Sequence, residues 1–115
     1  NQSQVNLAGW SPSTGDADWG LRPLFGGESW PPTLFNLAFY KNPKVDALIN
    51  DALATADQTR RNTDYAQAMR IIWDDAPWVF LHNPQNLSGV RTSVTDVYAL
   101  PDGTVDVRQA ALTGK

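Results

Sequence analysis

Apolar residues recur with a helical period in the middle of the chain. Asn42-Pro43 predicts a helix start, because an asparagine side chain caps the first turn and proline fits the first helical position. An apolar face follows at positions i, i+3, i+4, i+7, i+8 and i+11, formed by Val45, Leu48, Ile49, Ala52, Leu53 and Ala56. This spacing predicts an amphipathic helix of about three turns.

A second helical pattern follows after a connection of a few residues. Asp57 is placed to cap this helix and Pro77 is placed to end it. Its apolar face consists of Tyr65, Ala68, Met69, Ile72, Trp73 and Ala76. The charged residues mostly off this face are Arg60, Arg61, Asp64 and Arg70, and they favour a solvated surface over a binding patch. The short connection predicts an antiparallel helix pair.

Shorter segments on both sides of the helices have strand-like patterns. Residues 4–9 alternate in polarity, and residues 78–82 form a nearly all-apolar run of the kind found in buried strands. Weaker patterns predict strands within residues 87–97 and at residues 105–107. The predicted fold class is therefore α/β, in the sense of mixed α and β, with an antiparallel helix pair flanked by strands.

Length, charge and composition narrow the possible partners. The 115 residues are enough for one modest domain. A net charge of -3 without a run of Lys or Arg disfavours a nucleic acid or an anionic membrane as partner. The absence of cysteine excludes disulfides and thiol chemistry, and no apolar run has the length of a transmembrane span. Because the chain begins with Asn1 in a strand-like run, we expect it to be a piece of a longer protein.

The loop that runs from Gly9 to Trp19 is the candidate binding site. It carries hydroxyl and carboxylate side chains between two indole rings, at the end of a predicted strand. Turns do not require tryptophan, and aromatic rings beside small hydrogen-bonding groups are typical of surfaces that contact a small polar ligand. The rings and polar side chains of this loop are therefore candidate ligand contacts. The alternative is that Trp10 and Trp19 only anchor the loop to a core.

Two carboxylates and one guanidinium near this loop allow several interpretations. Asp16 and Asp18 suit acid–base chemistry or a cation, although capping is favoured, with Asp18 capping a short helix at residues 18–25 that breaks near Pro23. Arg22 is placed either to bind a ligand carboxylate or to pair with Asp16 or Asp18. His82 is the only histidine, and a structural role is favoured over catalysis.

The order of short motifs along the chain resembles one known family. Gly-Trp at residues 9–10 is followed by Gly-Asp-x-Asp, then by N-x-x-x-Y-x-N-P-x-V-D from Asn36 to Asp46. A Thr-Ala-Asp segment and Y-x-x-A-x-x-I-I-W-x-x-x-P-W-V come next. This order is similar to the C-terminal part of the family 5 extracytoplasmic solute-binding proteins of peptide and nickel ABC transporters, and most similar to the family's glutathione-binding members.

The resemblance implies a periplasmic-binding-protein-like II fold with two lobes that close on the ligand. Residues 1–88 would form part of the second lobe, and residues 89–115 would cross the hinge and return to the first lobe. The resemblance further implies a periplasmic receptor, soluble or lipid-anchored, that binds glutathione or a short peptide. It delivers the ligand to a membrane permease, performs no chemistry and uses no metal or cofactor.

The resemblance also carries ligand contacts over to the Gly-Trp loop. Trp10 and Ser11 match positions that touch the ligand in oligopeptide and dipeptide receptors of the family. Those receptors have an aspartate for the peptide ammonium three residues after the tryptophan, where this chain has Ser13. This difference favours a ligand that presents its amine elsewhere, such as glutathione with its γ-linked glutamate. Asp16 is a candidate partner for that amine, and Arg22 for a ligand carboxylate.

Two other classes of function stay open from the residues alone. One is a small hydrolase that uses Asp16 or Asp18 with His82. The other is a structural domain without a ligand, in which exposed apolar surface drives self-association.

Overall fold

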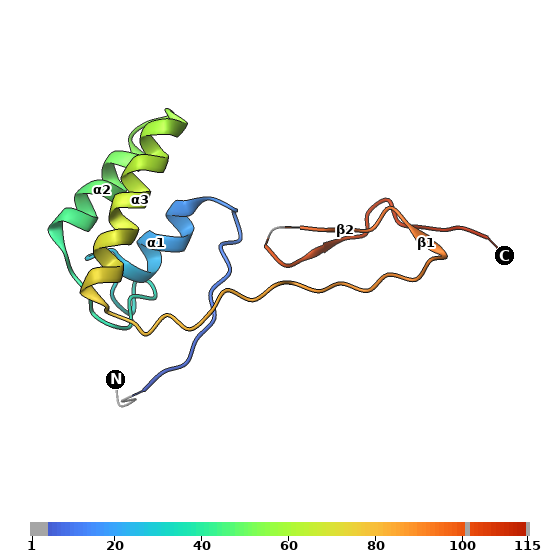
Figure 1. The fold of residues 1–115 in the computed structure, drawn as a ribbon, viewed down its shortest axis with the longest axis horizontal. Coiled ribbons are helices and arrows are strands. Elements are labelled where there is room, and N and C mark those ends of the chain that lie inside the picture. The colour runs from blue at the N-terminus through green and yellow to red at the C-terminus, as the bar shows by residue number, and fades with distance from the viewer. Residues whose placement is uncertain (1–4, 101, 115) are drawn as a thin grey trace. The chain divides into compact units, whose positions relative to one another are not determined.

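The computed structural model describes residues 5–100 and 102–114, which form two compact units that divide after Phe80. The first unit contains three helices, α1 (Ala17–Phe25), α2 (Pro43–Leu53) and α3 (Gln58–Asp75), and the second contains short strands (Figure 1). The predicted mixed α and β content is confirmed. The units divide between Phe80 and Leu81, and the assignment of residues 1–88 and 89–115 to two lobes stays a prediction.

The predicted caps of α2 and α3 are confirmed. The side chain of Asn42 accepts a hydrogen bond from the Lys44 N–H at 3.0 Å, with Pro43 at the first helical position. The Asp57 carboxylate accepts from the Thr59 N–H at 2.9 Å. These side chains satisfy donors that have no partner inside the helix. At the other end, α3 stops at Asp75 because Ala76 is left-handed, with φ 46°, ahead of Pro77.

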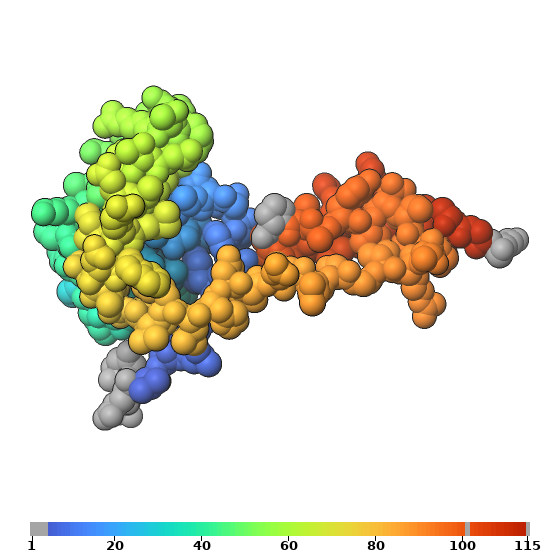
Figure 2. All heavy atoms as spheres, in the orientation of Figure 1, coloured from blue at the N-terminus to red at the C-terminus, as the bar shows by residue number. Residues whose placement is uncertain are grey.

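The core of the first unit lies where the three helices meet. After the turn at residue 54, α3 runs back along α2, as the predicted antiparallel pair does, and their atoms are closely packed (Figures 1 and 2). The buried apolar residues are Leu21, Leu24 and Phe25 of α1, Val45, Ile49 and Ala52 of α2, and Tyr65, Ala68 and Ile72 of α3. Each helix therefore contributes one apolar ridge to the core.

The apolar face predicted for α3 is wider than the face that the structure buries. Met69 is 52% exposed and Trp73 is 66% exposed, and Ala76 lies beyond the helix and is exposed. On α2 the prediction also fails at its end, because Leu53 is exposed and Ala56 follows the helix. The helical period is correct in both cases. Only the ridge that packs against neighbouring helices is buried, and the flanking apolar positions face outward.

The predicted short helix is present as α1, with two differences. Its cap is Asp16, whose carboxylate accepts from the Asp18 N–H at 2.8 Å, so the prediction that Asp18 caps the helix is wrong. Pro23 lies inside α1 and does not end it. Proline has no backbone N–H, so one carbonyl of the helix has no donor within the helix. A side chain from outside the helix donates to that carbonyl, as described below.

The strands predicted beside the helix pair are absent. Residues 5–9 and 78–82 have no regular secondary structure, while residue 4 lies outside the described residues. A strand is stable only when a neighbouring strand pairs with its backbone, and neither segment has such a neighbour within residues 5–100 and 102–114. Neither the alternating pattern nor the apolar run therefore sufficed to form a strand.

The second unit contains two antiparallel pairs of very short strands. β1 (Val94–Thr95) pairs with β4 (Ala111–Leu112), with Val94 opposite Leu112. β2 (Tyr98–Ala99) pairs with β3 (Val105–Asp106), with Tyr98 opposite Asp106. The strands predicted within 87–97 and at 105–107 are thus present only as two-residue segments. No helix in the described parts of either unit is long and apolar enough to cross a membrane.

Candidate functional site

Trp10 is held at the start of the candidate loop by the backbone of α1. Its indole Nε1–H donates a hydrogen bond to the carbonyl oxygen of Trp19 at 2.8 Å. In an α-helix that carbonyl accepts from the residue four positions later, which here is Pro23, a residue without an N–H. The proline inside α1 therefore leaves an acceptor that the Trp10 indole occupies.

Aromatic rings also contact the half-buried Trp10. The centroid of its ring lies 5.1 Å from that of Phe35 and 6.2 Å from that of Trp19, both at tilted angles. Trp10 packs against the hydrophobic core as a partly buried residue. The anchoring alternative for Trp10 and Trp19 is therefore compatible with the structure, and the remaining exposed part of Trp10 is available to a ligand.

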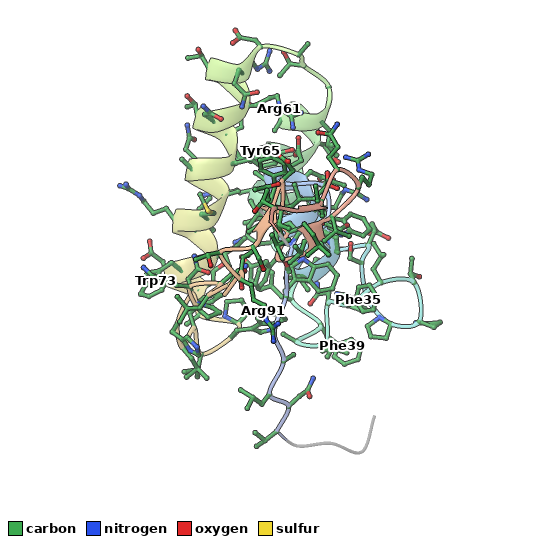
Figure 3. The ribbon with its side chains drawn as sticks, turned by 90° about the vertical axis from the view of Figure 1, so that its right-hand side faces the viewer. Phe35, Phe39, Arg61, Tyr65, Trp73 and Arg91 are labelled. Atoms are coloured by element: carbon green, nitrogen blue, oxygen red, sulfur yellow. The ribbon has the colours of Figure 1, made fainter. Side chains whose placement is uncertain are left out.

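Asp16 lies at the other end of the loop and is paired with an arginine from α3. Its carboxylate receives hydrogen bonds from Arg61 Nη2 at 2.7 and 2.9 Å. Arg61 also donates through Nη1 to the Ala52 carbonyl at 2.9 Å, and its guanidinium lies 5.4 Å from the centre of the Tyr65 ring (Figure 3). Burial raises the pKa of Tyr65. This arginine is 15% exposed, so the expectation that it belongs to a solvated face is wrong.

Arg22 is paired with Asp18 one helical turn away. Its Nε and Nη2 donate to the two carboxylate oxygens at 2.7 to 3.1 Å, and Asp18 is buried. Hydrogen bonding to this carboxylate raises the pKa of Arg22. Of the two alternatives for Arg22, the pairing with Asp18 is the one present in the structure.

The hydroxyl-bearing residues of the loop are exposed between these two fixed ends. Ser11, Ser13 and Thr14 all face solvent. The backbone turns tightly here, with the Gly15 N–H donating to the Pro12 carbonyl at 3.0 Å and Gly15 at φ 67°. The Thr14 hydroxyl accepts from the Asp16 N–H at 3.2 Å. The loop therefore presents small polar groups on a backbone that is ordered at both ends.

Asp16, Asp18 and His82 are the residues considered above for hydrolysis or for binding a cation. Asp16 and Asp18 are each paired with an arginine, and His82 belongs to the second unit and is exposed. Across the described residues, no group of three or more His, Asp or Glu side chains is placed to hold a metal ion. The two carboxylates near the loop are therefore engaged in ion pairs with arginines.

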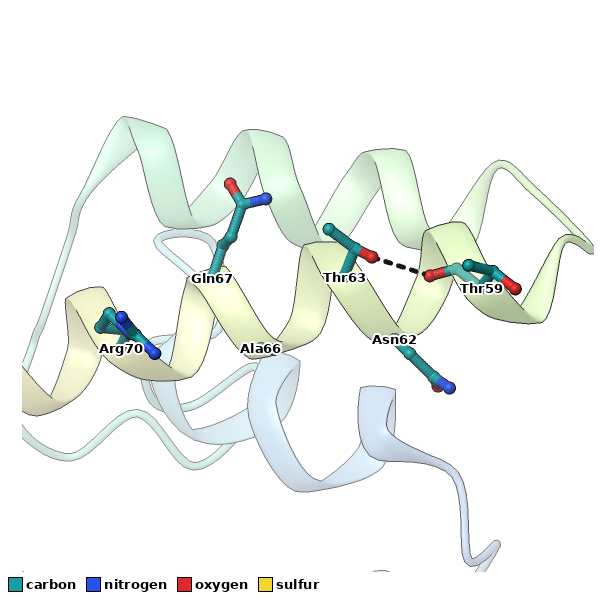
Figure 4. A pocket seen from close by; sticks show the side chains of 6 residues that line it. All are labelled: Thr59, Asn62, Thr63, Ala66, Gln67 and Arg70. Atoms are coloured by element: carbon teal, nitrogen blue, oxygen red, sulfur yellow. Dashed lines mark hydrogen bonds between the residues drawn. The ribbon is translucent and has the colours of Figure 1, made fainter.

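A shallow hollow lies elsewhere, on the exposed surface of α3 (Figure 4). Its lining comes from that helix alone: Thr59, Asn62, Thr63, Ala66, Gln67 and Arg70. The Thr63 hydroxyl donates to the Thr59 carbonyl at 2.9 Å, inside the helix. Because one helix face cannot enclose a ligand, we do not regard this hollow as the functional site.

Two residues at the site, Phe35 and Arg61, are not indicated by sequence patterns. Phe35 lies in a connection without periodicity, and nothing in the sequence indicates its contact with Trp10. Arg61 is one of several charged residues on α3, and its distance of 45 positions from Asp16 hides their pairing. One signal was available, because Pro23 follows Trp19 by four positions and a helix across both leaves the Trp19 carbonyl without its usual donor.

The chain is similar to curated proteins, although no family model matches it. It is 47% identical over 105 residues to the glutathione-binding protein GsiB of Pectobacterium atrosepticum. It is 45% identical over 94 residues to the proteins of the same name from Shigella dysenteriae and Escherichia coli K12. These matches cover 91% and 82% of the chain, but only 20% and 18% of the relatives.

The relatives favour a binding function among the classes that the residues left open. They are named as glutathione-binding proteins, so they do not support the hydrolase alternative. The resemblance predicted from the order of motifs is confirmed by their identity to this chain. The chain is a homologue of the glutathione-binding proteins named GsiB, and it spans about a fifth of their length.

Proposed function

We propose that this chain is part of a periplasmic receptor of an ABC importer, and that its Gly9–Trp19 loop contributes to a cleft for glutathione or a short peptide. The observation that carries the proposal is the identity of 45–47% to proteins named for glutathione binding. The chain corresponds to the C-terminal part of such a receptor, with residues 1–88 in the second lobe and 89–115 crossing to the first. The receptor delivers its ligand to a membrane permease.

Trp10 is the central ligand contact in this proposal. Its indole is fixed by the Trp19 carbonyl, so little conformational freedom is lost when a ligand packs against the ring. Ser11 and Ser13 follow on the exposed part of the loop, where their hydroxyls can hydrogen-bond to peptide groups of the ligand. A fixed aromatic surface beside small polar side chains suits a small, polar, peptide-like molecule.

Charged groups of the ligand would meet side chains that already have partners. The Asp16 carboxylate is 47% exposed, so it can be shared between Arg61 and a ligand ammonium. Arg22 contacts Asp18 through Nε and Nη2, so Nη1 is the nitrogen that a ligand carboxylate would reach. Because Ser13 carries no charge, an amine at that position would be buried without a counterion, at a considerable cost.

Calorimetric titration of the full-length protein with glutathione tests this proposal. We expect Trp10→Ala to weaken binding about tenfold or more, which corresponds to the loss of one aromatic contact. Trp73→Ala is the matched control, because Trp73 is an exposed indole on α3 that stacks on Phe80 instead. Failure of the unmodified protein to bind glutathione or short peptides would contradict the proposal. Equal affinities of the two variants would remove Trp10 from the site.

Self-association is the second candidate property, and exposed apolar residues of the first unit favour it. Trp73, Val79 and Phe80 are each at least 41% exposed. Apolar surface of this kind drives association when nothing covers it. We expect light scattering on the 115-residue chain to give an apparent mass that rises with concentration, and a constant monomer mass would contradict this expectation.

A further inference from the structure

We propose that Phe35 is a second aromatic contact for the ligand, adjacent to Trp10. The inference rests on the proposed function of the Gly9–Trp19 loop, and it assigns a residue outside that loop to the same contact surface. The two ring centroids are 5.1 Å apart and the ring planes meet at 53°. Phe35 is 50% exposed although it touches a half-buried indole, so the two rings form one surface that is partly open to solvent.

The backbone around Phe35 is fixed on both sides. Its N–H donates to the Pro23 carbonyl at 3.1 Å, and its carbonyl accepts from the Leu37 N–H at 2.8 Å. The next residue, Asn36, is fully buried, and its side chain bonds to the backbone of Gly26 and Tyr40. An exposed ring on an ordered backbone loses little entropy when a ligand covers it. Phe35 therefore has the preorganisation that a binding residue requires.

The same helix sets the positions of both rings. Trp10 is bonded to the carbonyl of Trp19, and Phe35 to the carbonyl of Pro23. Residues four positions apart lie one above the other on a helix face, so the two anchors are one turn apart on α1. The two rings are thus both attached to carbonyls of α1, which sets their spacing.

The chemistry of this surface indicates which part of a ligand it takes. Two apolar rings favour methylene groups and the planes of peptide bonds, while Ser11 and Ser13 supply hydrogen bonds beside them. The charged ends of the ligand have no counterpart on the rings. We therefore assign the Trp10–Phe35 surface to the uncharged middle of a short peptide-like ligand, which in glutathione runs from the side-chain methylenes of the γ-linked glutamate to the methylene of the glycine.

The chain offers a matched pair of phenylalanines for the test (Figure 3). Phe35 and Phe39 lie on the same connection between α1 and α2, and they are 50% and 47% exposed. Phe39 contacts Trp30, at 5.6 Å between centroids, instead of Trp10. In the full-length protein, we expect Phe35→Ala to weaken glutathione binding about tenfold. We expect Phe39→Ala to change it by less than about twofold.

Fluorine NMR then separates direct contact from an indirect effect through Trp10. With 4-fluorophenylalanine at position 35 or 39, saturating glutathione should shift the resonance at 35 and leave that at 39 nearly unchanged. A Phe35→Ala variant with unchanged affinity, alongside a weakened Trp10→Ala variant, would overturn this inference and leave the proposed function intact. A weakened Phe35→Ala variant without the resonance shift would also overturn the contact. Absence of glutathione binding by the unmodified protein would overturn both.

Discussion

Asp16 and Arg61 are 45 positions apart in the sequence and form an ion pair of 2.7 Å that joins the end of the candidate loop to α3. Asp16 also caps α1, and Arg61 also bonds to the carbonyl of the buried Ala52 in the last turn of α2. One arginine therefore connects all three helices at the point where the loop ends.

Replacing this arginine should loosen the loop and lower stability. We expect Arg61→Gln to reduce the free energy of unfolding by about 1–2 kcal/mol, a value kept low because Asp16 is about half exposed. Arg60→Gln is the control, since Arg60 is mostly exposed and its Nε lies 3.7 Å from Oδ2 of Asp64, too far for a hydrogen bond. Urea denaturation followed by circular dichroism measures both, and equal losses in the two variants would contradict the role given to Arg61.

Asp16→Asn offers a second arm of the same experiment. Asparagine caps a helix about as well as aspartate, so this change removes the charge and keeps the cap. If the two residues act through each other, the double variant should lose less stability than the sum of the single variants. Strict additivity would show that the ion pair contributes nothing measurable.

The missing N–H of Pro23 should control the environment of Trp10. In Pro23→Ala, the new backbone N–H is placed to bond to the Trp19 carbonyl and to compete with the Trp10 indole. We expect the resonance of the Trp10 indole N–H to move and its exchange with solvent to quicken by about tenfold, the factor that corresponds to ~1.4 kcal/mol. Assignment of the indole signals with Trp10→Phe permits this measurement.

A control for the proline variant is available in the same core. Leu24→Ala also removes buried apolar volume from α1, but it leaves the backbone donors of the helix unchanged. Faster exchange at Trp10 in both variants would point to a general loss of packing. Faster exchange in Pro23→Ala alone would support competition for the Trp19 carbonyl.

Asn36 should be among the residues most sensitive to substitution. Its buried Nδ2 donates to the carbonyls of Gly26 and Tyr40, and its Oδ1 accepts from the Tyr40 N–H at 3.0 Å. Asn36→Ala leaves buried backbone groups without partners, and we expect a loss of about 2–4 kcal/mol in the free energy of unfolding. Asn50→Ala, on the exposed side of α2, should cost almost nothing. If Asn36→Ala lowered the free energy of unfolding by less than about 1 kcal/mol, the hydrogen bonds of Asn36 would not be important for stability.

We expect the pKa of Asp75 to make the stability of the folded protein depend on pH in the acid range. The Tyr40 hydroxyl donates to its carboxylate at 2.6 Å and the Asn42 amide at 2.7 Å, and these bonds lower the pKa of Asp75. A carboxyl group with a lowered pKa stabilises the folded state above its unfolded pKa, near 3.8, and loses that contribution as the pH falls through the folded pKa.

Asp75→Asn should therefore be less stable than the unmodified protein at neutral pH, with a difference that shrinks below about pH 4. Unfolding curves between neutral and acidic pH measure this difference. Asp74→Asn changes the neighbouring exposed carboxylate and serves as control. A difference that is constant over the whole pH range would show that the hydrogen bonds do not favour the charged form of Asp75.

The helices of this chain were largely predictable because their signals are local. Caps at Asn42 and Asp57 act on backbone groups two or three residues away, and the helical period of the apolar residues needs no distant partner. The width of the buried face was not predictable. Met69 and Trp73 fit the period of α3, but burial depends on which neighbouring helix covers them.

The three helices, the mixed α and β content and the likeness to solute-binding proteins follow from local patterns or from the order of motifs, so they can be predicted from the amino-acid sequence. The assembly of the candidate site depends on contacts between distant parts of the chain, which become visible in the folded protein. The tertiary structure paired Asp16 with Arg61 and Arg22 with Asp18, and it placed Phe35 against Trp10. The strand-like segments at 5–9 and 78–82 show the same limit, because a strand depends on a partner elsewhere in the chain and a helix closes its hydrogen bonds within itself.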